Sequence, residues 1–427
     1  MNSLFRLLLC AWAALSAGCA HPPTITATPS ATGASQPAPL LLISIDAYRY
    51  DYIDRGFSPT LAMLARTGVQ AASMQPSFPS LTFPNHYTIV TGLRPDHSGI
   101  VDNTMFDPRL GKFSHENHQA VSDGRWWEGG TPIWVTADQH GMRTATMFWP
   151  GSEARIHGYR PDYWKPFDDS VSADQRVDQV LAWFDLPAAT RPRFVALYFD
   201  AVDHAGHKYG PGSAQEDVAL RATDAALARL VHGLKQRRLF QQINLIVVSD
   251  HGMAAVPEPN SVLLDQLIPI GQVRLVSSGI LAGLDPRSGS PRDLANFAAI
   301  EKQLEQPQRH MRCWNKHSVP ARLDYGSNPR VPRLLCLANL HWRIITSTNP
   351  ARLKGTLSVG SHGYDNADPL MQAIFIAHGP AFRVDAKVPA FPNVDVYPLM
   401  AHLLGLPAVA NDGSYAAVAA MLKPHSR

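Results

Sequence analysis

The sequence predicts an α/β fold in which helices cover both faces of a mostly parallel central sheet. Three aliphatic runs, at residues 40–45, 194–199 and 243–249, lack the polar alternation of a strand with one face in water, so each is expected to be buried on both sides. Helical patterns separate these runs, and repetition of strand and helix favours parallel pairing. A smaller α+β insertion is expected at residues 254–348, where short strands alternate with many Pro and Gly residues.

Length and composition describe a globular protein. The chain has 427 residues, which exceeds the size at which a single core usually keeps growing, so one large domain with a subdomain or two domains are expected. Hydrophobic residues make up 45% and charged residues 17%, a balance that argues against disorder. The net charge is only +3, and no basic run is longer than Arg237 and Arg238, so nothing indicates specific nucleic-acid binding. We expect a monomer that acts on a small molecule.

The N-terminus is typical of an exported protein. Arg6 precedes an apolar run at residues 7–15 that is too short to span a bilayer, which predicts a signal peptide at residues 1–19. The end of this segment resembles a bacterial lipobox with Cys19 as the lipidated residue, although Ser16 departs from that pattern, so a lipoprotein signal and a simple cleaved signal both stay open. Residues 20–39 are expected to form a flexible tether.

These features predict export to the periplasm, or attachment to the outer membrane, of a Gram-negative bacterium. The lipid on Cys19 would be the only membrane attachment. Cysteine usage agrees, because Cys10 and Cys19 lie in the targeting segment and leave Cys313 and Cys336 as a pair. In an oxidising compartment we favour a disulfide between them over two unpaired buried thiols.

The first part of the main domain covers residues 40–253. A helix is expected at residues 58–67, because Ser58 can cap it, Pro59 suits its first position and Gly68 ends it. The other expected elements of this part are helices at 87–93, 173–184 and 213–239, and a short strand at 141–148.

The insertion and the end of the chain follow. In the insertion, at 254–348, we expect one helix, at 293–304, and short strands at 272–277, 334–337 and 342–345. Residues 349–427 complete the main domain, with a strand at 371–377 and a final helix at 394–404.

Acidic side chains stand at, or a few residues past, the ends of the three long apolar runs. They are Asp46, Asp203 and Asp250, and ligands of parallel sheets gather at the carboxyl ends of the strands. A carboxylate at such a buried position needs a counter-charge, and for Asp46 both a metal ion and Arg49 stay open. After Asp250 and His251, a glycine allows the chain to turn away sharply.

Histidines accompany these carboxylates. His207 follows Asp203 at a spacing that suits one helical face or a loop, and His362 stands in a Ser-His-Gly segment. Each residue alone has an ordinary explanation, such as a surface pair or a loop histidine. Carboxylate and imidazole are ligands of Zn²⁺, however, and six of them are enough for two three-ligand sites, each with an open position.

Thr82 is an isolated hydroxyl among Phe and Pro residues, and the amide of Asn103 follows it along the chain. On its own such a threonine is most often a turn or helix-capping residue. Its position before the helix expected at 87–93 would place it near backbone N–H groups that favour an anion.

Many ordered blocks of the chain resemble the nucleotide pyrophosphatase/phosphodiesterase family of the alkaline phosphatase superfamily. The resemblance extends from Leu40 to about Gly413, and its most specific blocks are LISIDAYR, FPNHYTIVTGLRPDHSGIVDNTMFDP, VDHAGHKYGP, SDHGM and SHGYDN. It implies an alkaline-phosphatase-like sheet and two Zn²⁺ ions per chain. One ion would be held by Asp203, His207 and His362. The other would be held by Asp46, Asp250 and His251 with Thr82, the nucleophile.

The resemblance also implies a substrate site. Asn103 would donate a hydrogen bond to a phosphate oxygen, and Phe83, Trp149 and Phe167 would flank a nucleobase, with Phe167 standing where relatives often carry Tyr. The implied reaction is hydrolysis of nucleotide phosphodiester and phosphoanhydride bonds, through a phosphothreonine, to nucleoside 5′-monophosphates. The alternatives are a phospholipid or glycerophosphodiester hydrolase on the same scaffold and a non-catalytic, zinc-dependent binding lipoprotein.

Overall fold

A mixed eight-stranded sheet forms the centre of the main domain in the computed structural model, which describes residues 37–424. The predicted signal peptide, Cys10, Cys19 and most of the predicted tether lie outside the described residues. The strands of this sheet, in spatial order, are β19 (Ala386–Val388), β2 (Val69–Ala71), β18 (Phe375–His378), β9 (Asn244–Val248), β1 (Leu40–Ile45), β8 (Phe194–Phe199), β6 (Thr144–Met147) and β7 (Tyr163–Lys165). None of the helices within residues 37–424 is long and apolar enough to cross a membrane.

The prediction of a mostly parallel sheet is confirmed for its centre. Strands β9, β1, β8, β6 and β7 are parallel to one another, whereas β18 is antiparallel to both β9 and β2. In β1, Leu40 and Leu42 belong to one hydrophobic core while Leu41 and Ile43 belong to the other. Burial on both faces therefore explains why the run has no polar alternation.

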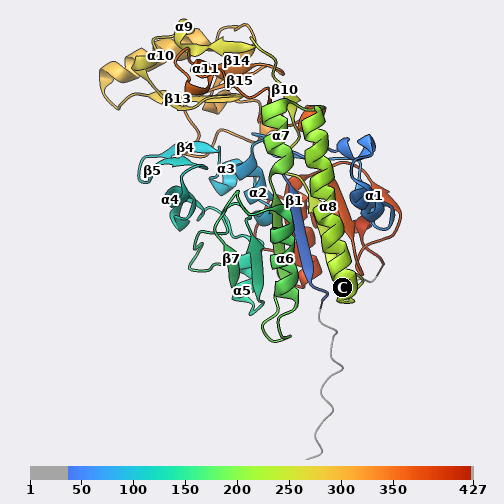
Figure 1. The fold of residues 1–427 in the computed structure, drawn as a ribbon. Helices are drawn as coiled ribbons and strands as arrows, with labels where there is room; N and C mark the ends of the chain where they lie inside the picture. Colours follow the sequence, from blue (N-terminus) through green and yellow to red (C-terminus); the bar gives the residue numbers. More distant parts are fainter. Residues whose placement is uncertain (1–36, 425–427) are drawn as a thin grey trace, which may run out of the picture. The chain divides into compact units, whose positions relative to one another are not determined.

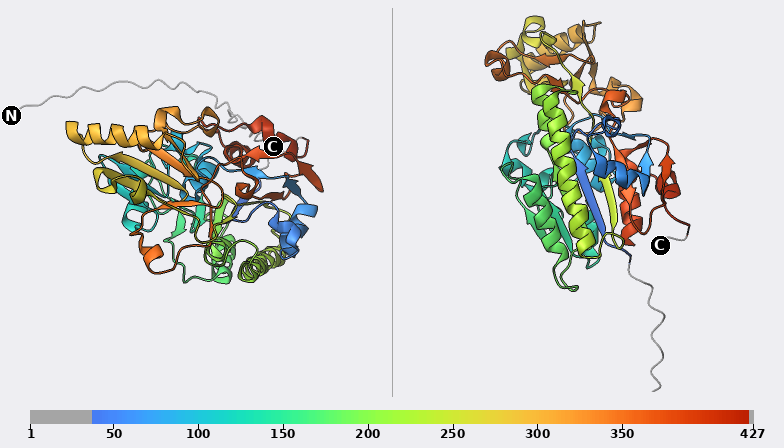
Figure 2. Two further views of the ribbon diagram at one scale, coloured as in Figure 1. Left: turned by 90° about the horizontal axis from the view of Figure 1, so that it is seen from above. Right: turned by 45° about the vertical axis from the view of Figure 1, so that its right-hand side comes forward.

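Helices cover both faces of the sheet (Figure 1). On one face lie the helices α1 (Pro59–Arg66), α6 (Ala173–Phe184) and α8 (Ala214–Gln236), and the green helices α6 and α8 are prominent in Figure 2. On the other face lie α2 (Thr82–Thr91), α5 (Ile133–Gln139) and α12 (Val396–Leu404). The shorter elements of the main domain are α3 (Pro95–Ser98), α4 (His118–Val121), α7 (Ala201–Tyr209), α13 (Tyr415–Val418), β3 (Met74–Gln75), β4 (Thr104–Asp107), β5 (Gly111–Ser114) and β20 (Phe391–Pro392).

Two helix starts differ from their predictions. Ser58 precedes α1 but makes no capping hydrogen bond, and its Oγ accepts a hydrogen bond from the hydroxyl of Tyr48 at 2.9 Å. The helix predicted at 87–93 is α2, which begins five residues earlier, at Thr82 itself. Pro84 obscured that start in the sequence, yet proline is tolerated in a first turn because the N–H groups there have no intrahelical partner.

The residues between 254 and 348 build a second sheet, four-stranded and antiparallel, in the order β12 (Val273–Ser277), β13 (Leu281–Pro286), β15 (Leu334–Ala338) and β14 (Met311–Asn315). Sequence patterns missed β13 and β14. The other elements here and at the segment's return are α9 (Leu264–Leu267), α10 (Pro291–Leu304), α11 (Pro350–Leu353), β11 (Ser261–Leu263), β16 (Arg343–Ile345), β10 (Ala254–Ala255) and β17 (Gly360–Ser361). Strands β10 and β17 pair where this segment leaves and rejoins the main domain.

Hydrogen bonds attach this segment beside the stretch that carries Asn103. The carboxylate of Asp96, in α3, accepts backbone N–H bonds from Gly326 at 2.9 Å and Asn328 at 3.0 Å. The hydroxyl of Tyr325 donates to the carbonyl oxygen of Val101 at 2.9 Å. The segment at 254–348 therefore supports one side of the site described below.

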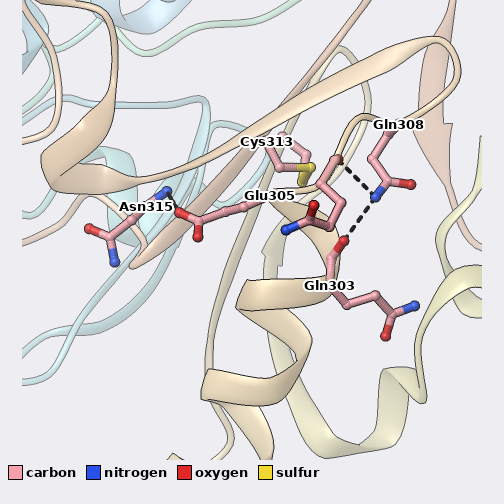
Figure 3. The surroundings of a disulfide bond; sticks show 7 residues. Gln303, Glu305, Gln308, Cys313 and Asn315 are labelled. Carbon is pink, nitrogen blue, oxygen red and sulfur yellow. Dashed lines mark hydrogen bonds between the residues drawn. A yellow bond between two sulfur atoms is a disulfide. The ribbon is translucent and has the colours of Figure 1, made fainter.

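Cys313 and Cys336 lie opposite each other in β14 and β15 and are joined by a disulfide, as the sequence favoured. Figure 3 shows its surroundings, where Glu305 at the end of α10 accepts a hydrogen bond from the backbone N–H of Asn315 at 3.0 Å.

Replacing both cysteines by serine is expected to destabilise the protein, because the bond closes a loop with a sequence separation of 23. The free energy of unfolding should fall by about 3 kcal/mol in the chain-entropy account. Urea unfolding of the double variant measures this, with dithiothreitol-treated wild type as the control. Equal stability of the two proteins before reduction would contradict the expectation.

Candidate metal centre and active site

The six expected ligands come together at the carboxyl ends of the central strands. Asp46 follows β1 directly, and Asp250 and His251 follow β9. Strand β8 leads into α7, which carries Asp203 and His207 one turn apart on a helix, so the helical alternative left open by the sequence is the observed one. His362 follows β17.

One group consists of Asp46, Asp250 and His251, which are all almost fully buried. Nε2 of His251 lies 3.5 Å from Oδ1 of Asp46 and 2.9 Å from Oδ2 of Asp250. These same two carboxylate oxygens are buried and have no hydrogen-bond partner within the described part of the chain. Buried charged atoms without partners are costly, so this group fits a bound cation.

The second group consists of Asp203, His207 and His362. Oδ1 of Asp203 lies 3.4 Å from Nε2 of His207 and 3.6 Å from Nε2 of His362, and it too is buried without a hydrogen-bond partner. The ring of His362 stacks on that of His251 with centroids 3.6 Å apart, so the two groups are adjacent.

Backbone carbonyls fix the orientation of all three imidazoles. Nδ1 of His207, His251 and His362 lies 2.9 Å from the carbonyl oxygens of Gly360, Gly252 and Ser80, respectively. A carbonyl oxygen can only accept, so each Nδ1 carries a proton, and in its neutral form each ring presents the lone pair of Nε2 to the centre.

The Nε2 atoms of His207 and His362 are 3.1 Å apart. Two lone pairs at that distance cannot hydrogen-bond to each other, whereas a cation between them would bind both. Together with the partnerless carboxylate oxygens, this arrangement fits two metal ions of the kind that His and Asp ligate.

The pKa shifts of these residues also fit a site for metal ions. Burial, with Asp250 and Asp203 nearby, raises the pKa of Asp46 well above its ordinary value. Although burial opposes it, the neighbouring His251 and His86 hold the pKa of Asp250 well below its ordinary value. Burial and the adjacent His251 and His207 lower the pKa of His362, so this imidazole is neutral, as a metal ligand must be.

Arg49, the other counter-charge considered for Asp46, is engaged elsewhere. Its Nε and Nη2 donate to Asp51 at 2.5 and 2.9 Å, and its Nη1 donates to the carbonyl oxygen of Met253. Asp46 instead accepts a hydrogen bond on Oδ2 from the hydroxyl of Tyr198 at 2.5 Å. The ion-pair alternative for Asp46 is therefore wrong.

Thr82 is the first residue of α2, and its Oγ1 lies 3.2 Å from Nε2 of His251. The hydroxyl thus stands beside the first group and at the positive end of a helix. The backbone N–H of Phe83, which has no partner within the helix, donates to Oδ1 of Asn103 at 2.9 Å. That bond fixes the amide of Asn103 and leaves its Nδ2 as the remaining donor.

A cavity of about 290 Å³ opens beside Thr82 and the second group. Phe83 and Phe167 line it and are partly exposed. Trp149 also lines it but is only 1% exposed, because its ring packs against His86 and its Nε1 donates to the His86 carbonyl oxygen at 3.3 Å. Of the three aromatics expected to flank a base, Phe83 and Phe167 therefore offer the accessible ring surface.

Other residues that line the cavity were not predicted from the sequence: Tyr198, Glu153, Phe148, His115, His118 and His204. A signal was available for Tyr198, since a single hydroxyl stands in the otherwise apolar run of β8. His115 and His118 lie on the segment after β5, where nothing in the sequence indicates proximity to Thr82.

Asp102 lies next to Asn103 and is 7% exposed. Burial raises its pKa to about 7, against hydrogen bonds from Thr104, Ser277 and Asn103. Because the folded-state pKa lies above the ordinary 3.8, the stability that this group contributes is complete at low pH and is lost as the pH rises through about 7.

Replacing Asp102 by asparagine should therefore remove part of the pH dependence of stability. At about pH 8 the variant is expected to exceed the wild type in free energy of unfolding by up to a few kcal/mol, and this advantage should vanish near pH 4. Urea unfolding at both pH values measures the difference. A difference that does not change with pH would contradict the expectation.

Comparisons with known proteins agree on one family. The model for type I phosphodiesterase / nucleotide pyrophosphatase matches residues 40–365. A pyrophosphatase/phosphodiesterase of Schizosaccharomyces pombe is 36% identical over 385 residues, which are 88% of this chain and 79% of the relative. A venom phosphodiesterase of Crotalus durissus collilineatus is 38% identical over 90% of this chain and 46% of its own length. Mouse ectonucleotide pyrophosphatase/phosphodiesterase family member 1 is 37% identical over 93% of this chain and 44% of its own length. The chain therefore spans less than half the length of these last two relatives.

Solved structures give the same result. Mouse ectonucleotide pyrophosphatase/phosphodiesterase 5 superposes with a TM-score of 0.84 at 33% identity, over 90% of this chain and 100% of the other. That structure contains an inactive threonine-to-alanine variant in complex with AMP. The human protein of the same name matches equally well. The alkaline-phosphatase-like α/β fold expected from the sequence is thereby confirmed.

Proposed function

Because the chain belongs to the type I phosphodiesterase / nucleotide pyrophosphatase family, we propose that it hydrolyses nucleotide phosphodiester and phosphoanhydride bonds and releases nucleoside 5′-monophosphates. The observation that carries this proposal is the threonine hydroxyl beside two adjacent groups of buried ligands whose carboxylate oxygens lack partners. The cavity with its two accessible aromatic rings begins at the same hydroxyl.

Zn²⁺ is the proposed metal at both groups, since the donors are imidazole and carboxylate in sets of three. Asp203, His207 and His362 would hold one ion, and Asp46, Asp250 and His251 the other. Bound zinc lowers the pKa of a nearby hydroxyl and neutralises negative charge that develops on phosphate oxygens.

In the proposed mechanism, Oγ1 of Thr82 loses its proton and attacks phosphorus, and the Oγ1–P bond forms as the P–O bond to the leaving group breaks. The nucleoside monophosphate is then esterified to Thr82 as the phosphothreonine intermediate. Water attacks the same phosphorus, breaks the Oγ1–P bond and releases the nucleoside 5′-monophosphate. The N-terminus of α2 stabilises the negative charge of the phosphate. Nδ2 of Asn103 donates to a non-bridging oxygen. Two successive displacements predict overall retention of configuration at phosphorus.

The phosphate group meets few positive side chains of the protein. No Lys or Arg among residues 37–424 lines the cavity, and the amide of Asn103 is neutral. A phosphodiester carries less negative charge than a phosphomonoester, so we expect a diester to be the better substrate.

A substrate panel tests the nucleotide assignment. We expect p-nitrophenyl thymidine 5′-monophosphate and ATP to be cleaved to nucleoside monophosphates, because Phe83 and Phe167 can stack on a base and each such contact contributes about 1–3 kcal/mol. Lysophosphatidylcholine and glycerophosphocholine are the comparison substrates. If these are turned over as well as the nucleotides, the enzyme is a phospholipid or glycerophosphodiester hydrolase with the same chemistry.

Export is part of the proposal. It rests on the apolar run and small residues at positions 1–19, which lie outside the described residues. Fractionation of cells that express the full chain tests it, and labelling with a fatty-acid analogue tests lipidation at Cys19.

A further inference from the structure

One buried arginine stands behind the wall of the cavity and takes no part in the mechanism above. Arg176, in the first half of α6, is 3% exposed. Its Nε donates to the carbonyl oxygen of Val171 at 3.0 Å, and its Nη1 donates to the carbonyl oxygen of Tyr198 at 3.1 Å and to Oδ1 of Asp200 at 2.9 Å. A buried arginine needs such partners, and these fix the plane of its guanidinium.

Two cavity-lining aromatic rings lie against that guanidinium. Its central carbon is 4.9 Å from the ring centroid of Phe148 and 5.9 Å from that of Phe167. Both are within the range of a cation–π interaction, which is stronger where water is excluded. The two rings also contact each other edge to face, with centroids 5.4 Å apart.

The backbone at both rings is also constrained. Phe148 has a positive φ of 67°, a conformation that is unfavourable for a bulky residue and persists only where the surroundings enforce it. The backbone N–H of Phe167 donates to Oε1 of Glu153 at 2.7 Å. The position of the Phe167 ring is therefore set by its neighbours and by Arg176.

Arg176 also reaches the elements that carry the metal ligands. Tyr198, whose carbonyl oxygen it binds, donates its hydroxyl to Asp46. Asp200 stands directly before α7, the helix of Asp203 and His207. A single side chain thus connects the aromatic wall with the frame of the metal centre.

We propose that Arg176 is a positioning residue that holds the Phe148–Phe167 pair at the correct place for nucleobase stacking. The inference rests on the proposed nucleotide function and concerns the base, which lies away from the reacting phosphorus. A lysine at this position keeps the positive charge beside Asp200, so loss of the planar guanidinium alone should weaken binding of base-bearing substrates and leave the chemical step largely as it is.

The test compares two diesters with the same leaving group. One is p-nitrophenyl thymidine 5′-monophosphate, and the other is methyl p-nitrophenyl phosphate, which has no base. Arg176→Lys keeps the charge beside Asp200 but loses the flat face and the fork of donors. We expect KM for the nucleotide diester to rise about tenfold at nearly unchanged kcat, and the ratio of kcat/KM between the two diesters to fall about tenfold. The dissociation constant of AMP, measured by calorimetry, should rise by a similar factor.

A double-variant cycle shows whether the effect passes through Phe167. In a Phe167→Leu background, Arg176→Lys should cause no further fall in the ratio of kcat/KM between the nucleotide diester and methyl p-nitrophenyl phosphate. Arg330→Lys is the matched control, because Arg330 is also largely buried, pairs with Asp107 at 3.1 Å and covers the ring of Trp126. It should leave the ratio unchanged even if it lowers the melting temperature. If Arg176→Lys does not fold, Phe148→Leu removes the intervening ring without touching a charge and should lower the same ratio.

The outcomes separate the two proposals. If wild type prefers the base-bearing diester and Arg176→Lys changes both substrates by one common factor, or neither, the role of Arg176 is overturned and the proposed function stands. If wild type shows no preference for the base-bearing diester, the base site itself is wrong and both proposals fall.

Discussion

Thr82→Ala is expected to lower kcat for p-nitrophenyl thymidine 5′-monophosphate by on the order of 10⁴-fold or more, because removal of a covalent nucleophile leaves only binding and charge stabilisation. The position of the hydroxyl supports this magnitude. Thr82 is the first residue of α2, and its Oγ1 lies 3.2 Å from Nε2 of His251, at the edge of the metal centre and of the cavity. Among the described residues, no other hydroxyl lies at the start of α2, beside Nε2 of His251 and on the lining of the cavity at once.

The same variant should still fold and bind AMP, since the methyl group of alanine fits the space of threonine and α2 has no side-chain cap to lose at this point. Release of p-nitrophenol measures turnover, and calorimetry with AMP measures binding. Thr82→Ser is the matched control, because it keeps the hydroxyl and should retain far more activity than Thr82→Ala. In wild type, acid quenching during turnover of p-nitrophenyl thymidine 5′-monophosphate, followed by peptide mass spectrometry, should find thymidine 5′-monophosphate esterified to Thr82.

Two results would count against this role. Turnover by Thr82→Ala above about one per cent of wild type would show that another group attacks phosphorus. Nucleotide binding in wild type with no turnover at all would favour the non-catalytic, zinc-dependent binding protein.

The centre of the fold was predictable because its strands are buried on both faces. For β1, β8 and α6 the predicted and observed bounds are identical, since each stretch has one strong pattern and a clear boundary. The convergence of four of the six candidate ligands, Asp46, Asp203, Asp250 and His251, could be expected for a related reason. Carboxyl ends of parallel strands meet at one edge of a sheet, so polar residues that follow buried runs are brought together by the fold itself.

The remaining features depend on contacts that one stretch of sequence does not contain. The start of α2 at Thr82 is stabilised from outside the helix, by Asn103 on the N–H of Phe83. Arg49 stands close to Asp46 along the chain, yet Asp51 takes its guanidinium. The strands β13 (LAGLDP) and β14 (MRCWN) have neither a continuous apolar run nor a regular polar alternation, and they are held by pairing with β15 and by the disulfide.

Removal of metal is expected to abolish turnover and to lower stability together. The atoms Oδ1 of Asp46, Oδ1 of Asp203 and Oδ2 of Asp250 are buried and without hydrogen-bond partners, and three Nε2 lone pairs face the same space. Without cations, the negatively charged carboxylates of these groups repel one another. A ligand present at about 1,000 times its dissociation constant stabilises a fold by about 4 kcal/mol, so loss of two ions should lower the melting temperature by several degrees or more.

Dialysis against 1,10-phenanthroline, followed by elemental analysis, activity and thermal unfolding, tests this expectation. Wild type should hold two zinc ions per chain before dialysis, and Zn²⁺ should restore both activity and melting temperature afterwards. Asp203→Asn, which weakens one group, should lower the metal content toward one. The matched control is Asp178→Asn, because this carboxylate pairs with Arg229 on the surface, at 51% side-chain exposure. It should keep two ions and full activity, since an exposed ion pair contributes little to stability. Full activity of a metal-free chain would show that the six residues serve only the fold and that Thr82 is activated in another way.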